Sequence, residues 1–351
     1  MSVAAQELRH RIRTAESAEK IVSALRLVAA ARIRSSSAAA LRARPFANHL
    51  QVMLSSLLRL AQTRRLDIKG IAHRTPTYAV NTITLHDPSV SKAFLDRIYL
   101  ALMHTPRTPQ VALIVVVTSD KRFCGAYNRD VIARAVRRMR HLSKAGYDVE
   151  LVIIGRTALQ FFQMHHKNVP IRYYAPLGRT SQALVTAGNL NNMLLSHFIA
   201  GAVERVEVVY TRFVSLIAST PSSRTILPVT PTGIETIGDE LFQLTSHNGH
   251  FATEPAPPPK SVYQPPPSLY DMSDDEIVML LNTMLPMYVA SQVQRIVRES
   301  IASEQASRLA AMQAATDNAR ELITRLRSLY NKQRQARITN EIIEVTSNVN
   351  L

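Results

Sequence analysis

The chain has 351 residues, 46% of them hydrophobic, which suffices for one large or two medium domains with a buried core and argues against broad disorder. Only ten glycines and no tryptophan favour a helix-rich protein, and a formal net charge of +16 favours acidic partners, which could be nucleic acid, anionic lipid or an acidic protein surface. The single cysteine, Cys124, excludes an internal disulfide and a cysteine-based zinc cluster, and no apolar run is long enough to predict a membrane-spanning helix.

Residues 1–62 are predicted to form one long amphipathic helix. Apolar side chains recur there every three or four positions and form one stripe: Leu8, Ile12, Ala15, Ala18, Val22, Leu25, Ala29 and Ile33. Most basic residues, including Arg26, are expected to lie off this stripe. Glycine is absent before Gly70, so the helix would be about 80 Å long and would need a partner along its length.

Residues 110–254 are predicted to form a Rossmann-like α/β domain with a mostly parallel sheet. Three strands are expected, at 111–118, 149–155 and 206–215, with helices at 128–142, 157–165 and 184–202. The first two strands are continuous β-branched runs, which is typical of strands buried on both faces, and helices between such strands indicate parallel pairing. Three glycines between 225 and 254 predict a hairpin extension.

The glycine-free segment 273–351 is predicted to form a second long helix. Ser273 and Glu276 have the spacing of a capping box at its start. One apolar stripe follows: Leu309, Met312, Ala315, Ala319, Leu322, Leu326, Leu329, Ile338, Ile342, Val345 and Val349. Before this helix, the proline-rich segment 255–272 is expected to be an exposed linker, and residues 63–109 are expected to be a loop or insertion of unassigned role.

The two terminal helices are expected to pack as an antiparallel coiled coil that projects from the α/β domain, because one leaves the domain and the other returns. The second helix is the longer one, so its tip at 338–351 would protrude and expose apolar surface. Such a tip requires an apolar socket in another protein. Residues 1–69 hold 13 basic against 4 acidic residues, which favours an acidic surface around the coil.

Motifs near both ends resemble the gamma subunits of F-type ATP synthases. The segment from Lys20 to Arg32 (KIVSALRLVAAAR) resembles the family's amino-terminal signature, and Arg44-Pro45-Phe46 follows it. The longer carboxyl-terminal motif is matched by SEQASR at 303–308, ATDNA at 315–319, YNKQRQARIT at 330–339 and EIIE at 341–344. The resemblance covers about residues 5–62 and 110–351 and lies nearest the cyanobacterial and chloroplast branch.

Two features depart from that pattern. The regulatory cysteine pair of land-plant chloroplast members is missing. Arg122 and Phe123 also stand where the family has glycine and leucine, directly before Cys124. The loop after the first predicted strand is therefore expected to differ from that of other members.

The resemblance implies the central-stalk rotor subunit of a proton-translocating ATP synthase, a subunit with no catalytic site, cofactor or metal of its own. The coiled coil would lie within the ring of alpha and beta subunits, and the α/β domain would contact the c-ring and the epsilon subunit. Rotation of the c-ring would then drive the conformational cycle of the catalytic beta subunits. The implied partner contacts are Lys20, Arg26, Arg32, Arg334, Gln335 and Thr339, with Ile342 in an apolar bearing.

The resemblance also implies a peripheral membrane location. The stromal side of the plastid thylakoid membrane is the first expectation, and a bacterial or mitochondrial inner membrane is the alternative. The Arg-, Ser- and Ala-rich start has the composition of a transit peptide, but Glu7, Glu16 and Glu19 interrupt its basic run. A cleaved presequence is therefore disfavoured.

Three signals of enzyme chemistry are weak. Cys124-Gly125 follows a predicted strand, but no Gly-Lys-Ser/Thr completes a phosphate loop. His165 and His166 are adjacent on a predicted helix and therefore point in different directions, which suits solvated side chains better than metal ligands. Gly155 stands alone, without the glycine fingerprint of a dinucleotide site.

Two other functions are kept as alternatives. A basic coiled coil could bind nucleic acid, but residues 1–44 contain no aromatic side chain on which a base could stack. An adaptor protein could use the proline-rich linker as a ligand for another domain. Copurification of alpha and beta subunits with the chain would separate the rotor from both.

Overall fold

The computed structural model describes residues 3–64, 111–199, 202–216, 218–227, 242–247, 250–255 and 271–349. The chain divides into two compact units. The helix-pair unit consists of Met1–Arg34, Phe123–Gly125 and Gln305–Leu351, and the sheet unit consists of Ser35–Arg122 and Ala126–Glu304. The predicted insertion at 63–109 and the predicted linker at 255–272 lie almost entirely outside the described residues.

The sheet unit is built on a five-stranded sheet with the strand order β3-β2-β1-β4-β5. Its strands are β1 (Val111–Val117), β2 (Asp148–Ile154), β3 (Ile171–Ala175), β4 (Arg205–Phe213) and β5 (Ser219–Leu227). The first four pair in parallel, and β5 runs antiparallel to β4. The predicted mostly parallel sheet is therefore confirmed.

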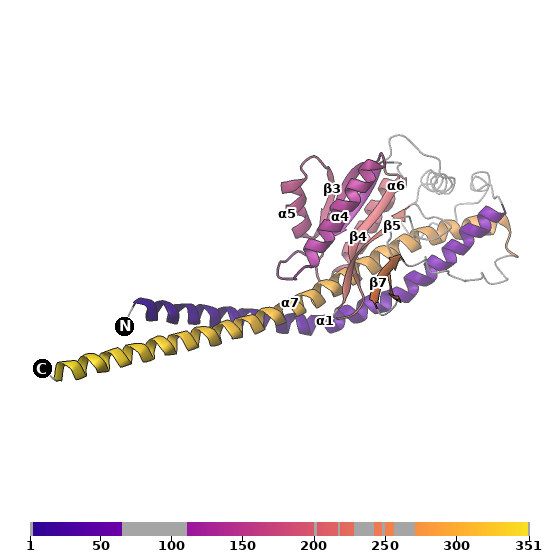
Figure 1. Cartoon of the computed structure of the whole chain (residues 1–351). Helices are drawn as coiled ribbons and strands as arrows, with labels where there is room; N and C mark the ends of the chain where they lie inside the picture. The colour runs from indigo at the N-terminus through magenta and orange to yellow at the C-terminus, as the bar shows by residue number, and fades with distance from the viewer. Residues whose placement is uncertain are drawn as a thin grey trace. The chain divides into compact units, whose positions relative to one another are not determined.

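Helices cover both faces of this sheet (Figure 1). Ile114 and Val116 of β1 pack against α4 (Tyr127–Lys144) and α5 (Arg156–His165). The alternate side chains of β1 face a second cluster, which is formed by α6 (Ala183–Ile199), the second half of α1 (Val3–Thr63) and the first part of α7 (Asp274–Val349). The β-branched runs of the sequence thus fill a core on each face, as expected for a parallel sheet.

Two strands were not expected from the sequence, and both lie at an edge of the sheet. In β3, exposed and half-buried residues alternate, and β5 is rich in serine and threonine and contains Pro221. Neither has the continuous apolar pattern of an inner strand, because an edge strand leaves part of its surface in solvent. The hairpin expected within 225–254 is present as β6 (Phe242–His247) and β7 (His250–Pro255), although β5 already includes residues 225–227.

The terminal helices pair in antiparallel fashion within each unit. In the helix-pair unit, four side-chain contacts join them: Arg9–Tyr330 at 2.7 Å, Glu16–Arg327 at 2.7 Å, Glu19–Arg320 at 3.2 Å and Arg26–Gln313 at 2.8 Å. In the sheet unit, Arg44 pairs with Glu299 at 2.8 Å and Asn48 with Arg295 at 2.6 Å. In these contacts, the residue number in α7 decreases as the residue number in α1 increases. The predicted antiparallel arrangement is therefore confirmed.

The face that α1 buries differs from the predicted stripe. Ala15, Ala29 and Ile33 are buried as expected, but Ala18 and Leu25 are exposed, and Glu19 and Arg26 are half-buried in their place. Buried and half-buried positions follow one another in alternating steps of four and three, a mean of 3.5 residues, as in a supercoiled helix pair. The prediction that Arg26 lies off the packed face is therefore wrong.

The same correction applies to α7. Leu322 and Leu329 are about half exposed, at 50% and 52%, while Ile323 is buried and Tyr330 is half-buried beside them. The predicted stripe includes the leucines because they are apolar and lie three or four positions from its other members. The buried Thr316 and Ile323 and the half-buried Tyr330 follow one another at intervals of seven, so the residue after each leucine faces the partner helix. Two leucines that were assigned to the seam are thus available to another surface.

The predicted capping box begins α7. The Ser273 amide and hydroxyl both donate to the Glu276 carboxylate, at 2.8 and 2.9 Å, and the Glu276 amide donates to the Ser273 hydroxyl at 3.4 Å. These hydrogen bonds lower the pKa of Glu276. The start of the longest helix is thus set by a local sequence signal.

A buried carboxylate ties the sheet to α4. Glu207 of β4 is 1% exposed, and it accepts hydrogen bonds from Arg138 of α4, one of them at 2.7 Å, and from Arg205. Burial opposes ionisation, but the hydrogen bonds and the positive charges of both arginines outweigh it and lower the pKa of Glu207. The charged form is therefore the one that the fold stabilises.

Glu207→Gln should lower the free energy of unfolding at neutral pH by about 3 kcal/mol, because it leaves two poorly solvated guanidinium groups without a counter-charge. The pKa of Glu207 is lowered in the folded chain, so its contribution is complete above the unfolded carboxyl pKa of about 4.3 and disappears as the pH falls through the folded value. Urea unfolding of the full chain at several pH values should therefore show the difference shrinking below about pH 4.3.

Glu150→Gln is the matched control. Glu150 pairs with Arg172 on the same sheet, but the Arg172 side chain is 43% exposed. Its loss should change the free energy of unfolding by less than about 1 kcal/mol. Equal destabilisation by the two variants would contradict the special role of Glu207.

Candidate functional site

The carboxyl edge of the parallel strands is the usual ligand position in an open α/β sheet. Here the carboxylate of Asp120, just beyond β1, accepts hydrogen bonds from the backbone amides of Arg156 at 3.2 Å, Leu177 at 3.2 Å and Gly178 at 3.0 Å. The amide of Arg156 opens α5, where a bound phosphate would lie in a nucleotide-binding fold. The protein's own carboxylate therefore occupies the anion position.

Gly155 closes the same edge by close packing. It has a φ of 100°, and a Cβ at this position would lie 2.1 Å from the Thr118 carbonyl oxygen. The Thr118 hydroxyl accepts a hydrogen bond from the Ala158 amide at 3.1 Å. The absence of a side chain at Gly155 thus lets the end of β1 pack closely against the start of α5. Hydrogen bonds within the chain occupy this edge of the sheet, where a ligand would otherwise bind.

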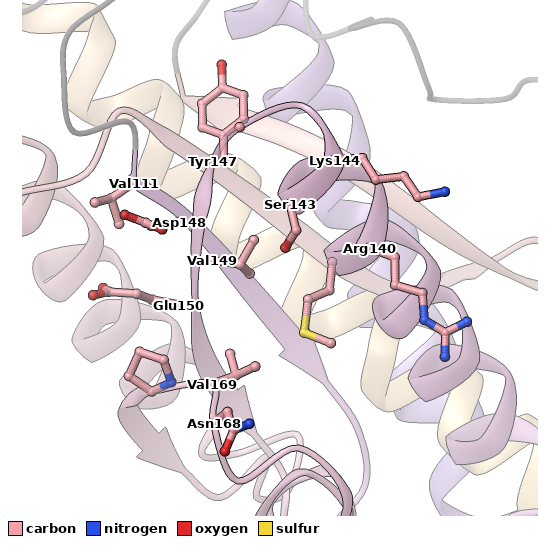
Figure 2. Close-up of a pocket in the computed structure, with 13 residues that line it drawn as sticks. Val111, Arg140, Ser143, Lys144, Tyr147, Asp148, Val149, Glu150, Asn168 and Val169 are labelled. Carbon is pink, nitrogen blue, oxygen red and sulfur yellow. The ribbon is translucent and has the colours of Figure 1, made fainter.

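A pocket of about 940 Å³ opens at the opposite, amino edge of the sheet (Figure 2). Val111 and Val149 line it together with the end of α4. The carboxylate of Glu150 is paired with Arg172 at 2.6 Å, and Asp148 is exposed. Among the residues that the structure describes, no group of three His, Cys, Asp or Glu side chains could hold a metal ion. The lining offers no nucleophile paired with a base.

The histidine pair lies on and just beyond the end of α5. The ring of His165 stacks on Phe161 with centroids 4.6 Å apart, and the ring of His166 lies 5.6 Å from Phe162. The ring of His166 also lies 5.9 Å from Phe161, so both histidines pack against phenylalanine rings of α5. The structure does not bring them together with a further metal-ligating group among the described residues.

Cys124 lies in the helix-pair unit, within the short segment Phe123–Gly125. It is 2% exposed, and its carbonyl oxygen accepts a hydrogen bond from the Ser307 hydroxyl of α7 at 2.7 Å. Gly125 has a φ of 57° and packs beside the same serine. Phe123, one of the two residues that depart from the family pattern, has a φ of 65° and is 69% exposed.

The predicted partner-contact residues lie in the helix-pair unit, mostly on its outside. Lys20, Arg32, Arg334 and Gln335 are exposed. Arg26 is the exception, because it is half-buried and donates to Gln313 across the seam. The Thr339 hydroxyl donates to the Gln335 carbonyl oxygen one turn earlier at 3.0 Å.

The tip of α7 exposes apolar side chains. The four cross-pairs place Val3, the first described residue of α1, level with about residue 336 of α7, so the following residues extend past it (Figure 1). Ile342 and Ile343 are each 57% exposed, and Ile338 is 42% exposed. The predicted protruding apolar tip is therefore present as far as residue 343.

Sequence reasoning missed a second apolar surface on α1. Ile21, Leu27 and Val28 are 63%, 61% and 46% exposed, although the amino-terminal motif contains all three. The predicted stripe already leaves all three outside it, so the same pattern could have identified them as exposed. The helix pair therefore carries basic and apolar side chains on its outer surface, which is a surface suited to surrounding protein.

Comparison with known proteins gives the family. A family model described as ATP synthase matches residues 4–350. The ATP synthase gamma chain of Synechococcus sp. is 36% identical over 341 residues, covering 97% of this chain and 96% of the relative. The gamma chain of Thermosynechococcus vestitus is 36% identical over 349 residues, with the same two shares of coverage.

One solved structure supports the fold. A chain of the Euglena gracilis mitochondrial ATP synthase, from a structure of OSCP, F1 and c-ring in rotational state 3, matches with a TM-score of 0.53 and 15% identity. The match covers 99% of this chain and 93% of that chain. The resemblance found in the terminal motifs is confirmed, and the chain belongs to the ATP synthase family, with gamma chains as its relatives.

Proposed function

We propose that this chain is the central-stalk rotor subunit of a proton-translocating F-type ATP synthase. The observation that carries the proposal is the tip of α7. There Ile338, Ile342 and Ile343 are exposed on the part of α7 that extends past the first described residue of α1. Apolar side chains gathered on an exposed helix end mark a site where another protein binds. A socket in the surrounding ring of alpha and beta subunits would supply that cover.

The helix pair would transmit rotation through its outer surface. Rotation changes the state of a beta subunit only if the contacts differ from one angle to the next, because equal contacts would shift no equilibrium. The exposed Lys20, Arg32 and Arg334 provide positive charge at separate heights, and the apolar side chains exposed on α1 differ in identity and position from those exposed on α7. The surface is therefore asymmetric around the pair, as a rotor requires.

The sheet unit would attach the rotor to the rest of the stalk. The solved Euglena chain comes from an assembly that contains F1 and a c-ring, and we extend that setting to this chain, with the c-ring and the epsilon subunit as partners of the sheet unit. The internal anion position at Asp120 supports a structural role for the sheet. Nucleotide chemistry would remain in the beta subunits, so the chain itself is a non-catalytic subunit.

The location follows from the partners. Among the described residues, no helix combines the length and apolar character needed to cross a bilayer, so the chain would join the membrane through the c-ring. Cyanobacterial gamma chains are among its relatives, which supports the stromal side of a thylakoid membrane over a bacterial or mitochondrial inner membrane. Fractionation of plastid membranes with an antibody to the chain would test this placement.

Ile342→Asp should impair assembly of the complex. An unpaired polar group costs about 2–7 kcal/mol to bury, and 1.4 kcal/mol is a factor of ten, so binding to the ring should weaken about 100-fold. Because Ile342 is 57% exposed in the chain, the free energy of unfolding of the chain alone should not change. The measurements are the yield of complex after purification and the urea midpoint of the free chain.

Val185→Asp is the control for this test. Val185 is 65% exposed on α6 and belongs to the sheet unit. It should give a normal yield of complex. A normal yield with Ile342→Asp as well would exclude an apolar bearing at the tip.

Arg334→Glu should reduce coupling between ATP hydrolysis and proton pumping about tenfold, which corresponds to 1.4 kcal/mol. The reason is that reversing an exposed charge converts attraction to an acidic beta-subunit loop into repulsion, and salt should weaken the effect. Proton pumping and hydrolysis by the assembled complex should be measured at low and high ionic strength. Lys167→Glu, an exposed reversal in the sheet unit, is the control; equal losses in the two variants would reject the role of Arg334.

A further inference from the structure

The helix α4 of the sheet unit carries an unusual concentration of positive charge. Its 18 residues contain five arginines, a lysine and a histidine, and Asp130 is the sole acid. The arginines fall into two groups that point in opposite directions. One group faces the sheet, and the other lies on the exposed side of the helix.

The inward group, Arg134 and Arg138, makes hydrogen bonds to the sheet. Arg138 makes two hydrogen bonds to the buried Glu207, and Arg134 donates to the Ser223 hydroxyl of β5 at 3.1 Å. These side chains join α4 to the strands beneath it. Their charge is therefore explained by the sheet unit itself.

The outward group forms what we call the α4 stripe, made of Arg129, Ala133, Arg137, Arg140 and Lys144. The residues are spaced by four, four, three and four positions, which places them on one helical face, and all five are exposed. Along the helix axis, the stripe from Arg129 to Lys144 spans about 22 Å.

Three of the four charges of the stripe lack a counter-charge among the described residues. Arg137, Arg140 and Lys144 make no ion pair or side-chain hydrogen bond there, and Arg129 pairs with its neighbour Asp130 at 3.1 Å. The acids closest to the end of the helix, Asp148 and Glu150, point away from Arg140 and Lys144 (Figure 2). Glu150 is moreover bound to Arg172.

The helix dipole explains only part of this pattern. Positive charge is favourable in the last turn, which accounts for Lys144. Arg129 lies in the first turn, where positive charge is unfavourable, and Arg137 is in the middle of the helix. Like charges at a spacing of three or four also repel one another. The stripe therefore opposes helix formation and requires another reason.

We propose that the α4 stripe is a docking surface for an acidic polypeptide segment, with at least three carboxylates distributed along about 20 Å. Charge complementarity carries this choice, since guanidinium groups bind carboxylates in a planar, bidentate way. Proteins that bind single-stranded nucleic acid stack bases on aromatic side chains, and helices that insert into a membrane surface bury large apolar side chains. The stripe has neither, because its uncharged member is Ala133.

This docking surface goes beyond the role proposed for the helix pair, because it lies in the sheet unit and involves none of the residues at the tip of α7. Its partner would be held beside the sheet while the helix pair performs its own function. The surface can therefore be tested in the assembled complex, independently of rotation.

Ala133 is the position from which to test the proposal. Replacing it with the photoreactive amino acid benzoylphenylalanine keeps all four positive charges, and Ala133 is exposed. Irradiation of the purified complex followed by mass spectrometry should yield a cross-linked peptide with at least three Asp or Glu residues. Adding Arg137→Glu, Arg140→Glu and Lys144→Glu should reduce that product about tenfold, and high salt should also reduce it.

Matched controls separate this surface from general basic charge. Arg156→Glu, Lys167→Glu and Arg179→Glu make the same change of charge at exposed positions elsewhere in the sheet unit and should leave the product unchanged. Benzoylphenylalanine at the exposed Gln163 of α5 should not give the acidic peptide. Urea midpoints equal to wild type will show that each variant folds.

Four results would overturn the proposal: no adduct, an adduct only with lipid or nucleic acid, a peptide without acidic residues, or equal loss in both triple variants. Copurification of alpha and beta subunits is scored in the same preparation. If those subunits are present and the acidic adduct is absent, the docking surface is rejected and the proposed rotor function stands. If the adduct forms without those subunits, the rotor function is rejected instead.

Discussion

Helices of 61 and 76 residues are unstable in water without a partner, so α1 and α7 depend on the seam between them. That seam is only partly apolar. Ala15, Ala29 and Ile33 alternate with half-buried Glu19 and Arg26, which reach side chains of α7. An apolar seam alone would tolerate sliding by a heptad, whereas a polar contact fits one register. The polar members therefore set which residues face outward and how far the tip of α7 extends.

The sheet unit uses an α/β architecture without its usual ligand position. Asp120 supplies the negative charge that a phosphate would bring to the start of α5, and Gly155 lets Thr118 approach the helix directly. Both features make the carboxyl edge of the sheet part of its own packing. The surfaces left for function are then those outside the sheet, on the exposed sides of its helices and in the helix-pair unit.

The sequence predicted the inner strands, the three helices of the sheet unit and the two terminal helices, because each has a strong periodic or β-branched pattern. It did not predict β3 and β5, since edge strands share their composition with loops. The terminal motifs identified the family, but the phase of the seam decided which residues are accessible. The predicted stripe of α7 contained Leu322 and Leu329, whereas the seam contains the residue that follows each of them, Ile323 and Tyr330.

The predicted contact residues show the same limit. Their identities came from the motifs, and their exposure could come only from the packing, which removes Arg26 from the free surface. The exposed Ile21, Leu27 and Val28 of α1, by contrast, lie outside the predicted stripe and could have been found from the sequence. At Leu322 and Ile323 both neighbours are apolar, and only the packing decides which of the two lies in the seam.

The net charge is +16, and the basic residues differ in whether the chain itself neutralises them. Arginines that face Glu207 or Glu299 are neutralised within the sheet unit, and those in the seam are paired across the two helices. Among the described residues, exposed basic side chains without an ion pair remain at Arg137, Arg140 and Lys144 of the α4 stripe and at scattered positions such as Lys20, Lys167 and Arg334. Exposed charges of one sign repel one another and are screened by salt, so they contribute little to the fold itself. The α4 stripe differs from the scattered positions because its charges lie on one helical face, where a single acidic partner can neutralise what the chain does not.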